Sequence, residues 1–350
     1  MSSTSPTRVG GGLAEAPAGP AAPSGAAVRP RRHSWWRRHR FQILALGPSA
    51  LLLFVFVYGF IGYTFRVSLS KWQGIAPNLE LEKPVGDTYR ALLETPRFQA
   101  DLRNTVVFTV LFLVLAVIAG LVLAVLVHDT LIGRSFFRSI FLFPYALSFI
   151  VTGVVWRWIF TPSTGANLIL DALGIEHKPK WITDPSVAGD VSSALEKIIP
   201  GGDFIQVKLG IPLAIIPVVI AASWQLTGFA MANFLAALSA VPEELREAAS
   251  LDGASWWQYQ RRIALPLLWP MVIAVAIILA HVSLKSFDLV YAMVGQGPGF
   301  ATDVPGIFVF EQMFRALRWN YGAGASMIMF LLVTAVVLPY LYRRNLKEAS

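Results

Sequence analysis

The chain has 350 residues and a net charge of +8; 55% of its residues are hydrophobic, only 14% are charged, and none is cysteine. Soluble domains carry about a quarter charged residues, so this composition excludes an ordinary soluble domain and predicts an all-α, polytopic integral membrane protein. The lack of cysteine excludes a disulfide framework and a thiolate metal site. The five histidines show no ligand spacing, so neither a metal nor a cofactor is expected.

Residues 1–40 are expected to form a disordered, basic, cytoplasmic segment. Residues 1–28 are rich in Ala, Pro, Gly and Ser, which cannot bury a core. Positive charges remain on the cytoplasmic side of membrane segments, which predicts a cytoplasmic N-terminus. The charges concerned precede the first apolar segment and are Arg29, Arg31, Arg32, Arg37, Arg38 and Arg40. A cleaved signal peptide is a poor interpretation, because the apolar segment starts late and is too long.

Six apolar segments supply the roughly 20 residues that a membrane crossing needs. They are expected near residues 43–65, 104–127, 136–160, 211–239, 267–291 and 321–342. Pro212 and Pro217 are expected to bend the fourth segment, because proline inside a helix removes a backbone hydrogen bond.

Six crossings place both termini in the cytoplasm. Loops 66–103, 161–210 and 292–320 then lie outside, although the Lys and Arg residues of the first loop oppose the charge rule.

The polar stretch from Glu247 to Pro266 follows the fourth crossing, on the cytoplasmic side. Gly253 permits a sharp turn or a left-handed residue. Ser255 and Gln258 have the spacing of a capping box that opens a second helix. Pro266 disfavours helical geometry at the residue before it and is expected to mark a break before the next apolar segment. The stretch is therefore predicted to form a helix, a glycine turn and a second helix at the membrane surface.

This stretch resembles the signature loop of the permease subunits of binding-protein-dependent ABC importers. The pattern is Glu-Ala-Ala, three residues, Gly, nine residues, Ile, one residue and Leu-Pro. Its fixed positions, expected to contact an ATPase, are Glu247, Ala248, Ala249, Gly253, Ile263, Leu265 and Pro266. The alternative is an ordinary polar connection, but fixed spacing in a membrane context is specific. We call residues 247–266 the signature loop.

The resemblance covers about residues 40–345, so a permease domain is expected over residues 41–345. The stretch FDLVYAMVGQGPGFATDV is similar to the carbohydrate branch of the family, which includes maltodextrin-type and glycerol-phosphate-type permeases. The resemblance implies a cytoplasmic-membrane subunit that moves a sugar or oligosaccharide by ATP-driven alternating access. It implies as partners a second permease subunit, two cytosolic ATPase subunits and an extracytoplasmic solute-binding protein.

Catalysis by this chain itself is not expected. It contains no GxxxxGK[ST] loop, so ATP hydrolysis is assigned to a separate subunit. Ser326 in Gly-Ala-Ser faintly resembles a rhomboid protease site, but Met327 replaces the expected glycine and His281 precedes the serine. The basic residues do not lie on a soluble domain, so no nucleic-acid partner is expected.

Candidate solute contacts lie on the fourth and fifth apolar segments, where polar groups are expensive unless they face a cavity or a partner. They are Trp224, Gln225, Gly228, Asn233 and Ser283. Trp224 and Gly228 share a helix face that would accept a sugar ring. The resemblance also matches Trp224, Gly228 and Ser283 to cavity positions of a maltodextrin-type permease. Ordinary helix packing remains the alternative for these positions. Lys285 and Asp288, at the outer end of the fifth segment, are expected to pair locally, and the alternative is that they line an external gate.

Other transport functions remain open. A permease for a polyol or a glycerol phosphate is the first alternative, although a phosphorylated solute would favour buried Arg or Lys in the path, and none lies in mid-helix. An ion-coupled secondary carrier would need intramembrane ionisable groups and often an inverted repeat. Neither is found, and the signature loop would remain unexplained.

Overall fold

The computed structural model describes residues 35–129, 133–176, 178–192 and 205–348, which fall into two units, Met1–Val57 and Tyr58–Ser350. In the first unit the described residues form α1 (Trp35–Leu53) and the start of the π-helical turn η1 (Phe54–Gly59). The boundary expected at residue 40 therefore falls inside α1. The remainder of the segment expected to be disordered, residues 1–34, lies outside the described residues.

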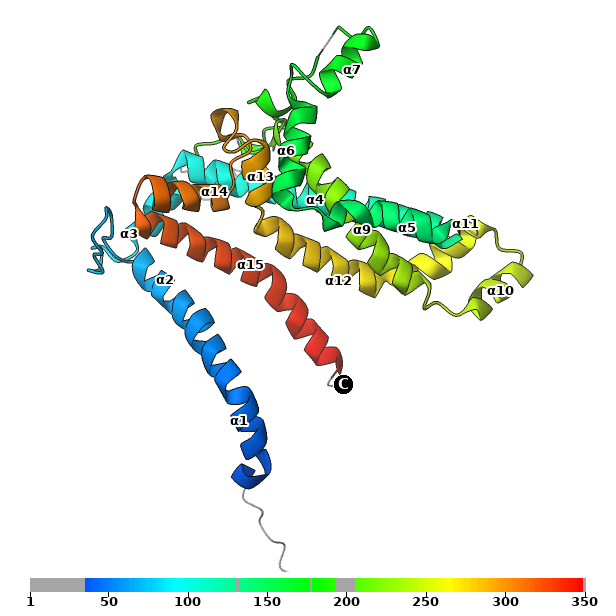
Figure 1. The fold of residues 1–350 in the computed structure, drawn as a ribbon, viewed down its shortest axis with the longest axis horizontal. Coiled ribbons are helices and arrows are strands. Elements are labelled where there is room, and N and C mark those ends of the chain that lie inside the picture. The colour runs from blue at the N-terminus through cyan, green and yellow to red at the C-terminus, as the bar shows by residue number, and fades with distance from the viewer. Residues whose placement is uncertain (1–34, 130–132, 177, 193–204, 349–350) are drawn as a thin grey trace, which may run out of the picture. The chain divides into compact units, whose positions relative to one another are not determined.

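The second unit is built almost entirely from helices in its described part (Figure 1). They are α2 (Phe60–Ser68), α3 (Asp87–Glu94), α4 (Pro96–Asp129), α5 (Arg134–Leu142), α6 (Phe149–Phe160), α7 (Ala166–Ala172), α9 (Ile215–Leu238), α10 (Glu243–Leu251), α11 (Trp256–Tyr259), α12 (Leu265–Leu284), α13 (Asp288–Met293), α14 (Pro305–Phe310) and α15 (Trp319–Glu348). Short 3₁₀ or π turns are η2 (Phe143–Ala146), η3 (Trp181–Thr183), η5 (Gln260–Ala264), η6 (Pro298–Phe300) and η7 (Glu311–Arg315).

In the described residues, one antiparallel strand pair, β1 (Val187–Ala188) with β2 (Ile211–Pro212), joins the middle of the long polar connection to the residues that follow its end. The all-α prediction is confirmed apart from this pair.

Five helical stretches of the described chain are long and apolar enough to cross a membrane: Leu44–Ser68, Pro96–Asp129, Ile215–Leu238, Trp256–Leu284 and Trp319–Pro339. They correspond to the first, second, fourth, fifth and sixth segments expected from the sequence. The third expected segment is a bent pair, Ser135–Ala146 and Phe149–Phe160, whose axes differ by 96°.

The prediction of one continuous third helix over residues 136–160 is wrong. Pro144 lies in η2, and Leu147 and Ser148 have extended backbones with ψ of 148° and 142°. The Ser148 hydroxyl then caps α6 by accepting the Ile150 amide at 3.3 Å. The helix breaks here because proline removes a donor and a serine cap starts a new helix a few residues later.

The prolines of the fourth segment also differ from expectation. Pro212 lies in β2, before the helix, and Pro217 lies in the first turn of α9. Neither bends the helix, because the first-turn amides of a helix have no intrahelical acceptor to lose. The fifth segment ends earlier than expected, since α12 ends at Leu284 and a separate helix, α13, begins at Asp288.

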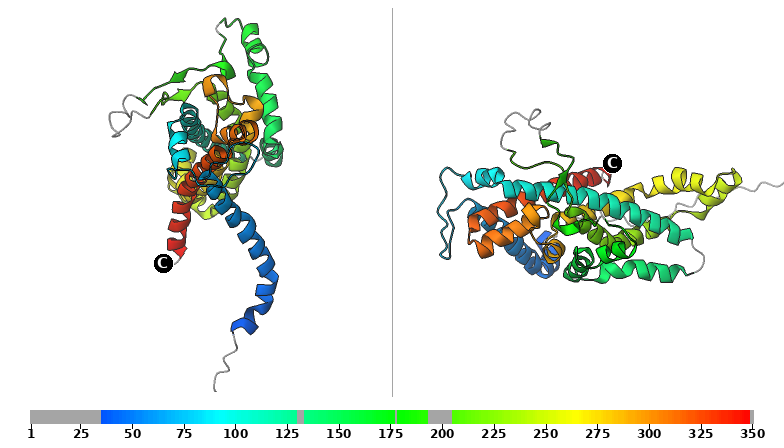
Figure 2. Two further views of the ribbon diagram at one scale, coloured as in Figure 1. Left: turned by 90° about the vertical axis from the view of Figure 1, so that its left-hand side faces the viewer. Right: turned by 90° about the horizontal axis from the view of Figure 1, so that it is seen from above.

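α4 and α9 pack along their length and run in the same direction. Near the start of α4, Arg103 Nη1 donates to the Lys208 carbonyl oxygen at 2.8 Å, a few residues before α9 begins. Further along, a Cβ on Gly120 would lie 2.6 Å from the Ala230 Cβ. Parallel neighbours must be joined by a segment that returns across the bundle, and the bent pair α5–α6 is that segment (Figure 2).

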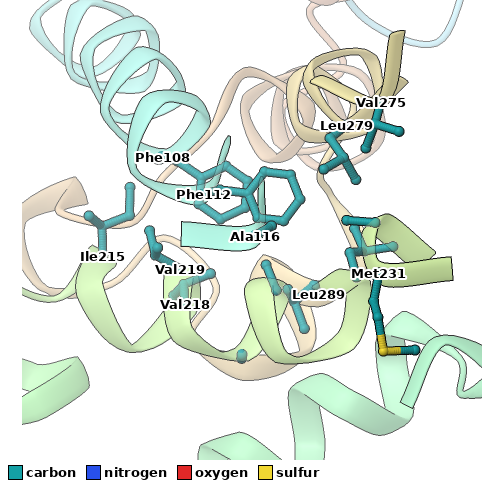
Figure 3. Close-up of a cluster of buried hydrophobic side chains, with 14 of the residues drawn as sticks. Phe108, Phe112, Ala116, Ile215, Val218, Val219, Met231, Val275, Leu279 and Leu289 are labelled. Atoms are coloured by element: carbon teal, nitrogen blue, oxygen red, sulfur yellow. The ribbon is translucent and has the colours of Figure 1, made fainter. Parts of the chain in front are cut away.

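The core of the second unit lies where α4, α9 and α12 meet. Figure 3 shows the rings of Phe108 and Phe112 on α4 between Val219 of α9 and Leu279 of α12. The two rings stack with centroids 5.7 Å apart. Each of these side chains is at most 4% exposed, so burial of apolar area holds the three helices together.

The start of α4 is fastened to the loop before α14. Arg97 Nε lies 2.7 Å from Asp303 Oδ2, and the Asn104 amide donates to the carbonyl oxygens of Phe300 and Asp303. Burial raises the pKa of the Asp303 carboxyl, while the Arg97 guanidinium lowers it in part. This end of α4 is thus anchored independently of the signature loop.

Candidate functional site

The signature loop is helical on both sides of Gly253. α10 begins after Pro242, which is the N-cap with φ −58° and ψ 134°. Glu243 and Glu244 lie in its first turn, where carboxylates are favoured. Glu247 lies one turn further on, and both it and Ala248 are exposed, whereas Ala249 is buried.

Gly253 ends α10 with a positive φ of 75°, as the sequence predicts. The Gly253 amide donates to the Ser250 carbonyl oxygen at 3.1 Å and the Ala254 amide to that of Ala249 at 2.9 Å. These two bonds form a Schellman motif, which uses a left-handed residue to satisfy the last carbonyls of a helix.

The capping box at the start of α11 is confirmed. The Gln258 amide donates to Ser255 Oγ at 3.3 Å, and the Ser255 amide donates to Gln258 Oε1 at 2.7 Å. Because both ends of the turn are fixed by local hydrogen bonds, α10 and α11 form one shaped unit rather than a loose connection.

The break expected at Leu265 is wrong. Leu265 has helical φ and ψ of −62° and −41°, and the helix continues from Trp256 through η5 into α12 as far as Leu284. Pro266 lies in the first turn of α12, directly after a π-helical turn. The wider π turn accommodates the proline ring, which would otherwise meet the carbonyl of the preceding turn. Ile263 and Leu265 are half-buried, and Pro266 is exposed.

Asp129, at the end of α4, contacts the signature loop and was missed by the sequence reasoning. Its Oδ2 accepts Trp256 Nε1–H at 2.6 Å and Gln260 Nε2–H at 3.3 Å. Trp256 is 127 positions away in the chain, so no local spacing signals the contact. The bond brings the end of α4 to the same end of the unit as the loop (Figure 1).

A cavity of about 240 Å³ lies far from the signature loop, where α4, α9 and α12 converge. Its aromatic lining comprises Phe108, Phe112, Phe149 and Phe287, and its polar or charged lining comprises His281, Ser283, Lys285, Ser286 and Asp288. Aromatic faces beside hydroxyl and charged groups are the kind of lining that holds a polar small molecule in one orientation.

Of the candidate solute contacts, Ser283 lines this cavity. Its Oγ lies 2.9 Å from Thr109 Oγ1 and 2.8 Å from the Ala280 carbonyl oxygen, both hydrogen-bond distances, so it joins α12 to α4. The aromatic residues Phe108 and Phe112 were not singled out from the sequence. Their spacing of four within an apolar helix is the only signal they carry, because it places two rings on one face.

The other four candidates do not line the cavity. Trp224 is 41% exposed and meets Trp156 edge-on with centroids 5.7 Å apart. Gln225 is buried and donates to the Leu147 carbonyl oxygen at 2.7 Å, while Asn233 donates to Phe229 O of its own helix at 2.8 Å. The structure therefore separates Ser283 from the Trp224 face of α9.

Gly228 packs against α5. A Cβ at this position would lie 2.0 Å from the Phe141 carbonyl oxygen, so the backbones of α5 and α9 touch here. A larger residue at 228 would thus displace α5 before it obstructed any solute.

Two other arrangements considered from the sequence are a Lys285–Asp288 ion pair and a catalytic role for Ser326. No Lys285–Asp288 salt bridge occurs within 4.0 Å in the described structure, so the expected local pairing is wrong, and both side chains are exposed at the cavity. The Ser326 hydroxyl donates to the Gly322 carbonyl oxygen at 2.8 Å, the bond of a serine inside an ordinary helix.

Residues 116–347 match the sequence family described as binding-protein-dependent transport system inner membrane component. The chain is 33% identical to a probable ABC transporter permease protein of Pyrococcus horikoshii, covering 86% of this chain and 94% of that one. It is 30% identical to a xylose/arabinose import permease of Haloferax volcanii, covering 85% of each chain. It is also 30% identical to a trehalose/maltose permease of Thermococcus litoralis, covering 87% of this chain and 94% of that one.

A similar fold occurs in the crystal structure of a bacterial ABC transporter involved in the import of the acidic polysaccharide alginate. The TM-score is 0.69 at 19% sequence identity, covering 88% of this chain and 97% of that one.

Proposed function

The chain belongs to the family of inner membrane components of binding-protein-dependent transport systems, and we propose that it is the permease subunit through which a sugar or oligosaccharide enters the cell. The observation that carries the proposal is the signature loop, whose fixed positions occur in a helix, a left-handed glycine turn and a second helix. Such a rigid, exposed unit is suited to receive motion from another protein.

The proposed partner at this loop is a pair of cytosolic ATPase subunits. Glu247 and Ala248 are exposed on α10 and available for docking, while Ala249 packs inward. The chain has no nucleotide-binding loop of its own, so ATP hydrolysis resides in the partner. A second permease subunit and an extracytoplasmic solute-binding protein complete the importer.

A neutral solute fits the cavity best. Its rings can stack on a sugar and its serine hydroxyls can bond sugar hydroxyls. Lys285 and Asp288 both line it, so their formal charges cancel. A glycerol phosphate would favour an excess of positive charge. The names of two relatives, permeases for xylose/arabinose and for trehalose/maltose, agree with a sugar.

The proposed mechanism is alternating access. ATP-driven closure of the ATPase pair moves the signature loop, which favours one of two arrangements of the helices around the cavity. In one arrangement the cavity receives solute from the binding protein outside, and in the other it releases solute to the cytoplasm. Both termini and the signature loop face the cytoplasm in this proposal.

The test is to purify the complex through a tag on this chain, identify its subunits and reconstitute it in proteoliposomes with its binding protein. Radiolabelled trehalose, maltose, xylose and arabinose are then tested for ATP-dependent uptake, with an inactive ATPase variant as the control. Uptake of at least one sugar is expected, and the isolated chain should hydrolyse no ATP. Robust ATP hydrolysis by the isolated chain, or a complex that transports none of these sugars, would contradict the proposal.

A further inference from the structure

We propose that Asp129 is a positioning residue that fastens the end of α4 to the second helix of the signature loop, so that movement of the loop is carried along α4 to the solute cavity. The inference rests on the proposed function and adds to it a transmission route and a residue outside the signature positions.

The contact is a compact, charge-assisted one. Oδ2 of Asp129 accepts from Trp256 Nε1 at 2.6 Å and from Gln260 Nε2 at 3.3 Å, two residues that lie one turn apart on α11 and η5. His128 Nδ1 lies 3.2 Å from the other oxygen, Oδ1. Hydrogen bonds to a carboxylate are shorter and stronger than neutral ones. One side chain thus joins two positions of the loop to the end of α4.

α4 is the right element to carry motion. It is one unbroken helix from Pro96 to Asp129 (Figure 2). Phe108 and Phe112, about halfway along it, line the solute cavity, and Thr109 Oγ1 lies 2.9 Å from Ser283 Oγ beside them. At 1.5 Å per residue, about 30 Å of rigid helix separates these residues from Asp129.

The route through Asp129 differs from the routes by which α9 and α12, joined to the signature loop along the chain, follow its movement. The signature loop is continuous in the chain with α9 before it and α12 after it, so those helices follow the loop directly. α4 has no such connection and receives the movement through packing and side-chain bonds. The Asp129 carboxylate is the bond by which α4 follows the loop together with α9 and α12.

The chain offers a matched set of variants. Asp129→Ala removes the acceptor, and Trp256→Phe removes one donor but keeps a ring. Asp129→Asn keeps an oxygen acceptor and should preserve part of the effect. Trp257→Phe is the control, because Trp257 is a neighbouring exposed indole whose Nε1 makes no hydrogen bond within the described residues.

The readout is the opening of the cavity rather than activity alone. The chain has no cysteine, so Ser286→Cys places a single thiol in the cavity lining. In the purified complex, its labelling rate by an impermeant maleimide is measured with and without a non-hydrolysable ATP analogue. ATP hydrolysis and complex yield are measured on the same preparations, and this readout requires no knowledge of the solute.

The analogue should change the labelling rate in the otherwise native complex and in Trp257→Phe. In Asp129→Ala and Trp256→Phe the nucleotide effect should shrink about fivefold or more, the usual lower range of coupling between sites, while ATP hydrolysis continues. The Asp129→Ala/Trp256→Phe double variant should be no worse than Asp129→Ala alone, because Asp129→Ala already removes the bond to Trp256 together with the bond to Gln260.

An undiminished nucleotide effect in Asp129→Ala and Trp256→Phe would overturn the inference. Equal losses in the Trp257→Phe control would also overturn it, since the effect would then be general to the loop. The absence of any nucleotide effect in the otherwise native complex would instead contradict the proposed function.

Discussion

Gly253 is the residue on which the shape of the signature loop depends. Its φ of 75° lies in the left-handed region, yet a Cβ built there would meet no atom within 4 Å. Substitution is therefore opposed by the backbone conformation alone and not by packing. The left-handed region costs roughly 1–2 kcal/mol for most L-residues and less for asparagine.

We expect transport per assembled complex to follow this conformational order. Gly253→Asn should retain most uptake, Gly253→Ala should lose more, and β-branched Gly253→Val should lose most, because it is least compatible with positive φ. Uptake and complex yield measured on the same preparations check the order. Similar uptake in the Asn and Val variants would show that the left-handed turn is not required.

Residues fixed by local geometry were predictable, and those fixed by distant partners were not. The Gly253 turn and the Ser255–Gln258 capping box follow from positions within a few residues of each other. The bond from Ser283 to Thr109 spans 174 positions. Because the sequence does not give the packing of α4 on α12, it identified Ser283 as a candidate but neither its partner nor the cavity rings.

At the scale of elements, close backbone approach holds α4 to α9. Gly120 lies so near α9 that a Cβ would be 2.6 Å from the Ala230 Cβ and 3.1 Å from the Met231 amide nitrogen. Gly62 on α2 is the matched control, since a Cβ there meets nothing within 4 Å. Small residues at such contacts allow helices in membranes to pack closely.

Gly120→Ala is expected to destabilise the complex, and Gly62→Ala to leave it unchanged or slightly more stable. Both gain helix propensity of about 1 kcal/mol, but only the first is overpacked, at about 1–3 kcal/mol. Combining Gly120→Ala with Ala230→Gly should recover part of the loss, because the Met231 backbone still limits the space. Thermal unfolding of the purified complexes checks this; equal melting temperatures for the two single variants would contradict it.

The bent third crossing shows which sequence signals were underweighted. Apolar content alone predicted a continuous helix over residues 136–160, but Pro144 and the N-cap Ser148 were both visible within it. Conversely, Pro217 and Pro266 were read as a bend and a break, yet Pro217 lies in the first turn of α9 and Pro266 directly follows the π-helical turn η5 within a continuous helix. The position of a proline within its helix decides the outcome, and that position depends on where the helix starts.

For the whole molecule, the hydropathy pattern predicted the number of apolar segments and, because successive crossings alternate in direction, the parallel course of the second and fourth segments. The contact of Arg103, near the start of α4, with Lys208, shortly before α9, agrees with this parallel course. Ser135–Ala146 alone would be about 18 Å long at 1.5 Å per residue, short of the about 30 Å hydrocarbon core. The return across the bundle therefore involves both parts of the bent pair.

The orientation of the second unit gives the last prediction. The signature loop and the start of α9 lie at opposite ends of α4, because Asp129 bonds Trp256 while Arg103 bonds Lys208. Ser250 on α10 and Ser186 beside β1 are both exposed and belong to these two ends. Since the chain lacks cysteine, Ser186→Cys and Ser250→Cys each create a single thiol in it. In cells freed of any wall, an impermeant maleimide should label Ser186→Cys but not Ser250→Cys, and permeabilised cells should label both. The reverse pattern would place the signature loop outside, away from cytosolic ATP, and would contradict the proposed coupling.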